Sequence, residues 1–410
     1  MQTKNFASVL AALLGLAGTV HTAQAQLAFP QASSAVQPVN DLFYASPSAL
    51  SLNSAQPGDV LRYRPIPLNS GNGYAGIVRE GYQVMYRTAD GRGKPTAAIA
   101  TILIPANAPA TGRKLLAYQS FYDSLTLNCT PSYLTVQGKL FEESNIDSTL
   151  KKGIVVVLPD YEGLQSQWIE GMNAAHGVLD SIRATMKFNK AGVDAAAQVA
   201  MMGFSGGGHA TGWAAEVAPE YAPELNLVGA ALGGIPVMPG HVAQKVDGGF
   251  FSSVYFGAVV GLLRANPQID INKYATSAGL TMVKDMGNRC LLGMFEGQSD
   301  MLIKYAFTKS SKFIKDPNFL KLPEIAAILQ ENSMATRTPR IPLYIYEGTA
   351  DEVMPLADVD ALVQRYCGAG VKVQYHRIFG DHLGMSISPD GAIGYVQDRL
   401  DGKAVPSNCQ

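Results

Sequence analysis

The sequence predicts an α/β fold, built on a mostly parallel sheet with helices on both faces. Short apolar runs typical of buried strands alternate with stretches of helical spacing along most of the chain. One such run precedes Gly203-Phe204-Ser205-Gly206-Gly207, a pattern typical of a sharp strand-to-helix turn. The alternation stops between about 240 and 336 and then resumes. These observations indicate one core interrupted by an insertion.

The first part of the mature chain is predicted to hold an arm and a meander. Residues 26–60 are rich in Ala, Ser, Pro and Gln and show little periodicity, so we interpret them as an extended arm. Strands are expected at 61–68, 82–87 and 97–104, with a glycine-containing turn at 89–93.

The parallel part of the sheet is predicted from six further apolar runs. Helices are expected at 169–186 and 209–217, between some of these runs, and such alternation is typical of a parallel sheet. The six strands are expected at 115–121, 153–158, 199–203, 227–232, 341–346 and 371–378.

The interruption is interpreted as a helical cap over residues 240–336. Helices are expected at 251–265, 301–314 and 322–334, and no convincing buried strand occurs there. A second independent domain is the alternative, but the strand pattern resumes at Ile341, which favours an insertion. The core then consists of residues 26–239 and 337–410.

Composition and the N-terminus indicate an exported globular protein. Of 410 residues, 47% are hydrophobic and 16% charged, enough for a sizeable core. The net charge of −1 gives no bulk attraction to nucleic acid. Lys4, the apolar residues 6–20 and Ala23-Gln24-Ala25 match a secretory signal over residues 1–25, cleaved after Ala25. No other long apolar segment follows, so no stable membrane insertion is expected.

Four cysteines remain in the mature chain: Cys129, Cys290, Cys367 and Cys409. An even count in an exported protein suggests two disulfides, and three pairings are possible. The proximity of Cys367 and Cys409 in the sequence makes Cys129 and Cys290 the natural second pair. The chain has no Cys-x-x-Cys or His-x-x-x-His spacing, so we expect no zinc site.

Ser205 requires a base, because a serine hydroxyl is a poor nucleophile at neutral pH. His382 follows the last predicted core strand, and loops at the carboxyl ends of strands form active sites in such folds. The alternatives are less suitable: His176 and His209 lie in predicted helices, His241 begins the insertion, and His376 lies within a strand.

Asp351 is the candidate carboxylate that orients the base. It lies in the turn after the strand predicted at 341–346, with Glu352 and Asp381 as competitors. The order Ser205, Asp351, His382 is that of α/β-hydrolases. An oxyanion hole is expected from the N–H of Gly206 and from the loop 119–124.

These residues belong to blocks that resemble the secretory lipase family. The most specific block begins Gly203-Phe204-Ser205-Gly206-Gly207-Gly208-His209-Ala210-Thr211 and continues through 220–226. The resemblance also covers 122–124, 129–133, 160–163, 351–355 and 381–383.

The resemblance implies hydrolysis of triacylglycerols and other carboxylic esters under a helical cap with an acyl-binding tunnel. No metal or organic cofactor is implied. The cap is the part that matches least, so chain-length preference is the least determined property. The implied roles are Ser205 as nucleophile, His382 as base, Asp351 as its partner, Asp123 beside Gly206 in the oxyanion hole, and disulfides Cys129–Cys290 and Cys367–Cys409.

A lipase acting at an oil–water interface is preferred to other enzymes on this scaffold. Apolar residues recur at helical spacing over 251–263, and such a cap helix could offer apolar surface to lipid. An acyltransferase, a small-ester esterase and a serine peptidase are the alternatives, and a non-catalytic binding protein is a remote one. The sequence does not indicate an oligomeric state.

Overall fold

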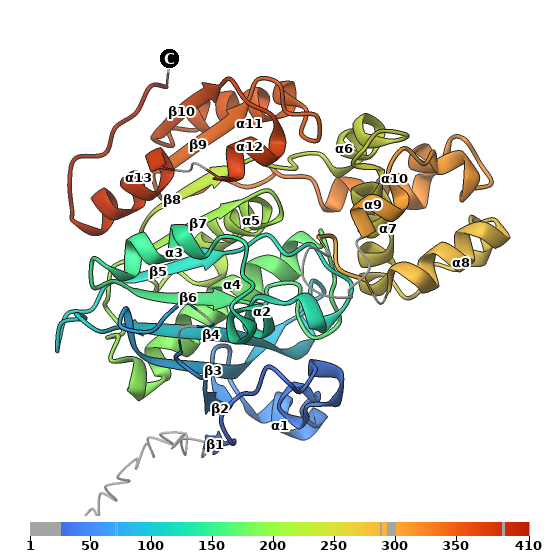
Figure 1. Ribbon diagram of the computed structural model, residues 1–410. Helices are drawn as coiled ribbons and strands as arrows, with labels where there is room; N and C mark the ends of the chain where they lie inside the picture. The colour runs from blue at the N-terminus through green and yellow to red at the C-terminus, as the bar shows by residue number, and fades with distance from the viewer. Residues whose placement is uncertain are drawn as a thin grey trace, which may run out of the picture.

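The fold is described from a computed structural model, which covers residues 26–69, 71, 73–287, 289–292, 301–387 and 390–409. The predicted signal segment 1–25 lies outside the described residues. The predicted α/β class is confirmed: the described strands form one ten-stranded sheet in the order β1-β2-β3-β4-β6-β5-β7-β8-β9-β10 (Figure 1). The strands are β1 (Leu27–Ala28), β2 (Val60–Pro65), β3 (Val78–Ala89), β4 (Pro95–Pro105), β5 (Leu115–Gln119), β6 (Val155–Pro159), β7 (Val199–Phe204), β8 (Leu227–Gly233), β9 (Leu343–Gly348) and β10 (Val373–Ile378).

The sheet changes from antiparallel to parallel at β6. Strands β2, β3, β4 and β6 pair antiparallel, whereas β6, β5, β7, β8, β9 and β10 pair parallel. The carboxyl ends of the parallel strands therefore lie at one edge of the sheet, where loops meet. The meander predicted from the first three apolar runs and the turn at 89–93 are confirmed.

Helices cover both faces of the sheet, which explains why its strands are apolar on both sides. In β7, Val199 and Met201 pack on one face, while Ala200, Met202 and Phe204 pack on the other. The first face carries α4, α5 and α11, and the second carries α2, α3 and α13. The α-helices of the core are α1 (Ala49–Ser54), α2 (Pro131–Gln137), α3 (Glu143–Leu150), α4 (Gly171–Lys187), α5 (Gly206–Tyr221), α11 (Leu356–Gly368), α12 (His382–Ile387) and α13 (Asp390–Leu400).

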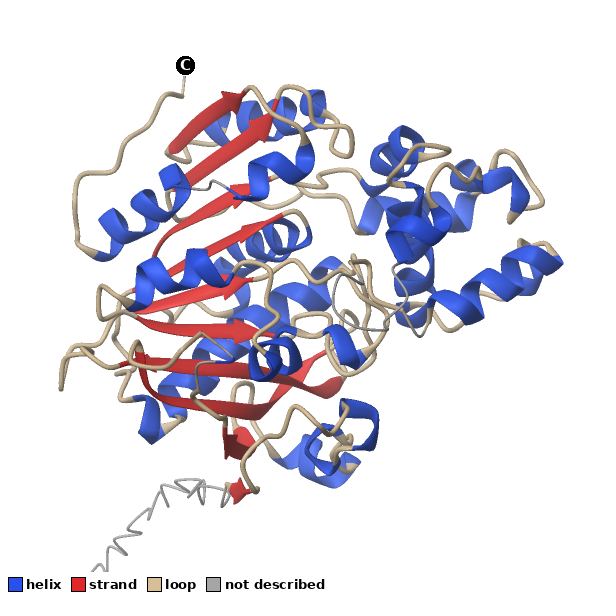
Figure 2. Ribbon diagram, in the orientation of Figure 1, coloured by secondary structure: helices blue, strands red, loops and turns tan. Residues whose placement is uncertain are grey.

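A group of helices between β8 and β9 lies beyond the carboxyl ends of the parallel strands. In Figure 2 the arrowheads of these strands point toward that group. Its side chains form a separate apolar cluster around Phe256, which also includes Leu125 and Trp168 of the core segment. The helices are α6 (Pro239–Val246), α7 (Ser252–Ala265), α8 (Ser277–Met286), α9 (Met301–Tyr305) and α10 (Pro323–Glu331).

Two predictions of local structure were wrong. The helix predicted at 301–314 ends at Tyr305, because Phe307 adopts a left-handed φ of 57° that a helix cannot continue through. The segment 26–60 is not merely an extended arm, since Phe43 and Tyr44 are buried against Met85 and Ile99 of the sheet. None of the helices in the described parts of the chain has the length and apolarity that a membrane span requires.

Candidate active site

Ser205 occupies a strained turn between β7 and α5. Its φ of 52° and ψ of −121° lie outside the regions that side-chain-bearing residues ordinarily adopt. The glycines around it allow this turn. A Cβ at Gly203 would overlap the carbonyl of Gly207, and a Cβ at Gly207 would overlap that of Gln119. The predicted strand–turn–helix arrangement is therefore present, with the serine at its apex.

The structure brings Ser205, His382 and Asp351 into one hydrogen-bonded chain. Ser205 Oγ lies 2.9 Å from His382 Nε2, and His382 Nδ1 lies 2.6 Å from Asp351 Oδ2. All three residues are buried, with exposed fractions of 8%, 5% and 6% respectively. This is the geometry of a nucleophile, a base and an orienting carboxylate.

Hydrogen bonds hold Asp351 in place and favour its ionised form. Its Oδ1 accepts from the backbone N–H groups of Val353 and Met354, each at 2.7 Å. Burial opposes ionisation of Asp351, but its bond to His382 and these backbone donors outweigh burial and lower its pKa. Asp351 is thus an anion that can stabilise a protonated imidazole.

The competing acids have other partners. Glu352 Oε2 accepts from the backbone N–H of His382 at 3.0 Å, and Asp381 Oδ1 accepts from that of Gly384 at 2.7 Å. Neither contacts the His382 ring through a hydrogen bond among the described residues.

The other histidines occupy structural positions. His209 is fully buried in α5, and burial lowers its pKa to about 3. His176 Nδ1 pairs with the backbone carbonyl of Asp90, and the exposed His241 pairs with Asp358. His376 lies in β10, as predicted. Within the part of the chain described, only His382 joins the serine.

Asp123 lies against the first residue of the elbow helix. A Cβ on Gly206 would overlap Asp123 Oδ1, and that oxygen is buried without a hydrogen-bond partner among the described residues. Burial raises the pKa of Asp123 to about 7. The N–H of Gly206, as the first helical residue, has no acceptor within its own helix. Two groups that can hold an oxyanion thus meet beside Ser205.

Ser205 and His382 line an apolar pocket formed by the core and the helices between β8 and β9. It holds about 780 Å³ of space, including its open mouth. Trp168, Phe251 and Tyr255 contribute to its walls, and none of the described residues that line it is a lysine or an arginine. A second apolar pocket, of about 530 Å³, shares Pro239, Ala243, Tyr255 and Ala258 with the first. Among the described residues, no group of three His, Cys, Asp or Glu side chains is arranged to hold a metal ion.

The secretory lipase family model matches residues 130–408 of this chain. The chain belongs to the secretory lipase family. Lipase A of Arthroderma benhamiae is 34% identical over 396 residues, covering 92% of this chain and 82% of that protein. Lipase 5 of Candida albicans is 31% identical over 392 residues, covering 91% of this chain and 83% of that protein.

Solved structures agree with this assignment. The X-ray structure of Candida antarctica lipase A is 29% identical, with a TM-score of 0.83 over 92% of this chain and 89% of that chain. The esterase LipA of Xanthomonas oryzae, at 16% identity and a TM-score of 0.67, shares the fold. A probable inactive lipase of Mycobacterium tuberculosis is also 30% identical. Because a relative with this name is similar to the chain as well, we infer catalysis from the geometry at Ser205 in addition to membership of the family.

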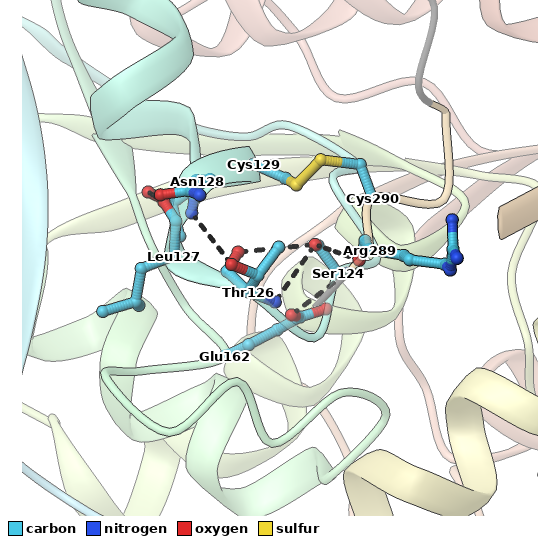
Figure 3. The surroundings of a disulfide bond; sticks show 9 residues. Ser124, Thr126, Leu127, Asn128, Cys129, Glu162, Arg289 and Cys290 are labelled. Atoms are coloured by element: carbon cyan, nitrogen blue, oxygen red, sulfur yellow. Dashed lines mark hydrogen bonds between the residues drawn. A yellow bond between two sulfur atoms is a disulfide. The ribbon is translucent and has the colours of Figure 1, made fainter. Parts of the chain in front are cut away.

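Both disulfides implied by the resemblance to secretory lipases are present. Cys129–Cys290 joins the loop after Asp123 to the segment after α8, and Cys367–Cys409 joins α11 to the C-terminal tail. Figure 3 shows that Ser124 lies near the first bridge, and its Oγ donates to the backbone carbonyl of Arg289 at 3.3 Å. The oxyanion loop, residues 119–129 around Asp123, is thus attached to the segment after α8 by a disulfide and by a hydrogen bond.

Buried acids behind the site were not predicted from the sequence. Glu142 accepts bonds from Tyr118, Ser120 and the backbone of Phe121, and burial raises its pKa to about 8. Glu347, fully buried in β9, lies behind Asp351. The available signal for Glu347 was a single charged residue at the end of an otherwise apolar strand.

Removing the two disulfides separately should have different effects. The chain-entropy model predicts that Cys129→Ser with Cys290→Ser costs about 1 kcal/mol more than Cys367→Ser with Cys409→Ser, because the first loop closes 161 residues and the second 42. Only the first pair of substitutions should also lower kcat, since only that bridge holds the oxyanion loop. Chemical unfolding and kcat on a soluble ester measure both effects. Equal losses of kcat in the two double variants would contradict this role.

Proposed function

We propose that this secretory lipase hydrolyses carboxylic esters of lipids through an acyl intermediate on Ser205. The observation that carries the proposal is the hydrogen-bonded chain from Ser205 to Asp351 at the base of an apolar pocket. Among the described residues, the lining is apolar apart from Asp123 and the reacting groups, which suits the acyl chain of a lipid ester better than a peptide.

Each residue of the chain has one task in this mechanism. His382 Nε2 takes the proton of Ser205 as its Oγ attacks the ester carbonyl, and the ionised Asp351 stabilises the imidazolium. His382 then protonates the leaving alcohol. It later deprotonates the water that releases the acid from Ser205.

We assign the oxyanion hole to the N–H of Gly206 and the carboxyl of Asp123. An ionised carboxylate would repel an oxyanion, so Asp123 can stabilise it only as a hydrogen-bond donor in its protonated form. Its pKa, raised to about 7 by burial, keeps that proton under mildly acidic conditions. This contribution is present below about pH 7 and is lost as the pH rises through that value.

The helices of residues 240–336 are proposed to act as a cap that binds the acyl chain. Ser205 lines the first pocket, and the second pocket adjoins it at Tyr255 and Ala258 of α7, which line both. An acyl chain bound in the first pocket would continue into the second. The adjoining pockets therefore favour long-chain esters over short ones.

Exposed phenylalanines near the pocket support action at a lipid surface. Phe307 and Phe379 are 71% and 91% exposed. Phe307 packs on Phe250, whose ring contacts the pocket residue Phe251, and Phe379 precedes His382 by three residues. Aromatic side chains that gain contact with lipid would hold the pocket mouth at the interface.

We further propose that residues 1–25 direct export and are cleaved after Ala25. Membership of the secretory lipase family and two disulfides support an exported, oxidised protein.

Replacing the nucleophile tests the proposed function directly. Ser205→Ala should lower kcat on p-nitrophenyl and triacylglycerol esters by about a millionfold, because the acyl intermediate cannot form. Circular dichroism and thermal unfolding should match those of the unsubstituted protein. Ester hydrolysis by Ser205→Ala at an unchanged rate would exclude Ser205 from the mechanism.

A larger side chain where the two pockets adjoin should change the preference for acyl chain length. We expect Ala258→Phe to lower kcat/KM for long-chain p-nitrophenyl esters by about tenfold or more, with short-chain esters affected less than threefold, because the added ring displaces several methylenes. Ala265→Phe, at the end of the same helix and outside both linings, is the matched control. Equal losses on both esters, or the same change in the control, would argue against the assigned acyl path.

Removing the exposed rings should affect emulsified substrates only. The double variant Phe307→Ser, Phe379→Ser is expected to lose about tenfold in activity on emulsified long-chain triacylglycerol, since each ring contributes apolar contact with lipid. Hydrolysis of a soluble short-chain ester should stay within about twofold. Leu50→Ser, which removes an 81% exposed leucine from α1, should change neither rate. A parallel loss on the soluble ester would show that the rings act on the site rather than at the interface.

A further inference from the structure

A second carboxyl group lies behind Asp351. Glu347 is the penultimate residue of β9, and no part of it is exposed to solvent. Its side chain interacts with that of Asp351, whose Cβ lies 3.4 Å from where a Cβ on the adjoining Gly348 would be. It also accepts from two backbone donors, Ile235 N–H on Oε2 and Gly348 N–H on Oε1, each at 3.2 Å. The proposed mechanism leaves this group without a role.

A hydrogen bond between two carboxyl groups requires one proton, because two carboxylates offer only acceptors. Asp351 already accepts from His382 and from two backbone donors at 2.7 Å or less, which stabilises its anion. The two backbone bonds to Glu347 are longer. The shared proton therefore belongs on Glu347.

The surroundings of the pair agree with this placement. Burial and the neighbouring charge of Asp351 raise the pKa of Glu347 well above its usual value, while the pKa of Asp351 is lowered. Lys245 of α6 donates to the backbone carbonyls of Asp351 and Met354 rather than to a carboxyl group.

Two other polar side chains lie near the pair in sequence. Among the described residues, Glu352 accepts from the backbone N–H of His382. Tyr346 of β9 is buried, and this burial is the main cause that raises the pKa of its hydroxyl, so it stays neutral.

We propose that Glu347 is a positioning residue of the triad. It stays protonated and donates a hydrogen bond to Asp351, so that the pair presents one negative charge to His382. This rests on the proposed catalytic role of Ser205, His382 and Asp351. Glu347 also holds Ile235 N–H, next to Gly234, where a Cβ would lie 3.1 Å from His382 Cε1. It thus connects the acid to the loop beneath the imidazole.

Two substitutions separate donation from simple packing. Glu347→Gln keeps an uncharged donor toward Asp351, although its amide cannot accept both backbone N–H groups. Glu347→Leu removes the donor altogether. For Glu347→Gln we expect kcat on a soluble p-nitrophenyl ester within about threefold of the original, and for Glu347→Leu a loss of about 10- to 100-fold with KM changed less than twofold.

The acid limb of kcat/KM shows whether Glu347 carries a proton. If it does, Glu347→Gln leaves the charge near His382 unchanged, and the limb should stay at the same pH within about 0.3. If Glu347 is ionised, the substitution removes a negative charge, and the limb should move to lower pH by about 1 or more. The limb therefore reports the charge of Glu347, whereas the contrast in kcat between Glu347→Gln and Glu347→Leu reports its donation to Asp351.

Glu216→Gln is the matched control. Glu216 is also buried, on α5, where it binds Tyr366 Oη and the backbone N–H of Ala335, without a contact to the triad. This control should alter thermal stability at most and leave kcat unchanged.

Infrared difference spectra of the resting protein provide a readout that does not depend on activity. Subtracting the spectrum of Glu347→Gln should reveal the band of a buried carboxylic acid, even if Ser205 proves not to be the nucleophile. A displaced acid limb, a missing carboxylic-acid band, or a Glu347→Leu variant with unchanged kcat would each overturn the proposal.

Discussion

The close approach of β7, β5 and α5 around Ser205 is the constraint on which the site depends. Because the carbonyl of Gln119 lies where a Cβ of residue 207 would be, the elbow admits only glycine there. At this close approach Ser205 adopts a φ of 52°, at the carboxyl end of β7. The parallel pairing of β7, β8, β9 and β10 brings the loops carrying Asp351 and His382 to the same edge.

Burial gives the ionisable groups around Ser205 different properties. Three donors favour the ionised form of Asp351 and lower its pKa, whereas burial raises the pKa of Asp123, Glu142 and Glu347. The anion of Asp351 therefore faces the His382 ring, and Asp123 lies beside Gly206. This arrangement suits a reaction in which a cation forms on the imidazole and an anion forms beside Gly206.

The helices between β8 and β9 contribute the apolar part of the site. They cover the edge where the triad lies, and the bridge Cys129–Cys290 attaches them to the oxyanion loop. Hydrogen bonds reinforce this attachment: Arg264 of α7 donates to the backbone carbonyl of Leu125 at 2.8 Å. The proposed acyl site and the proposed oxyanion hole are therefore joined by a disulfide and by this hydrogen bond.

Local sequence determined the parts of this protein that depend on spacing along the chain. The apolar runs predicted the core strands, and the glycines around Ser205 predicted the elbow, because strand burial and tight turns leave a local signal. The chain order of Ser205, Asp351 and His382 predicted the triad residues that the structure brings together. The prediction of a helix over 301–314 was wrong because the left-handed position is occupied by Phe307 rather than by a glycine, so the sequence gives no sign of the break.

Only the tertiary structure decided the contacts between segments far apart in the sequence. Glu347 is an ordinary acid in the sequence, and it becomes a neighbour of Asp351 only when β9 and the following turn fold together. The unpartnered oxygen of Asp123 and the adjoining pockets likewise depend on which surfaces exclude water. Hydrogen-bond partners, burial and the resulting proton positions are properties of packing, and spacing along the chain does not encode them directly.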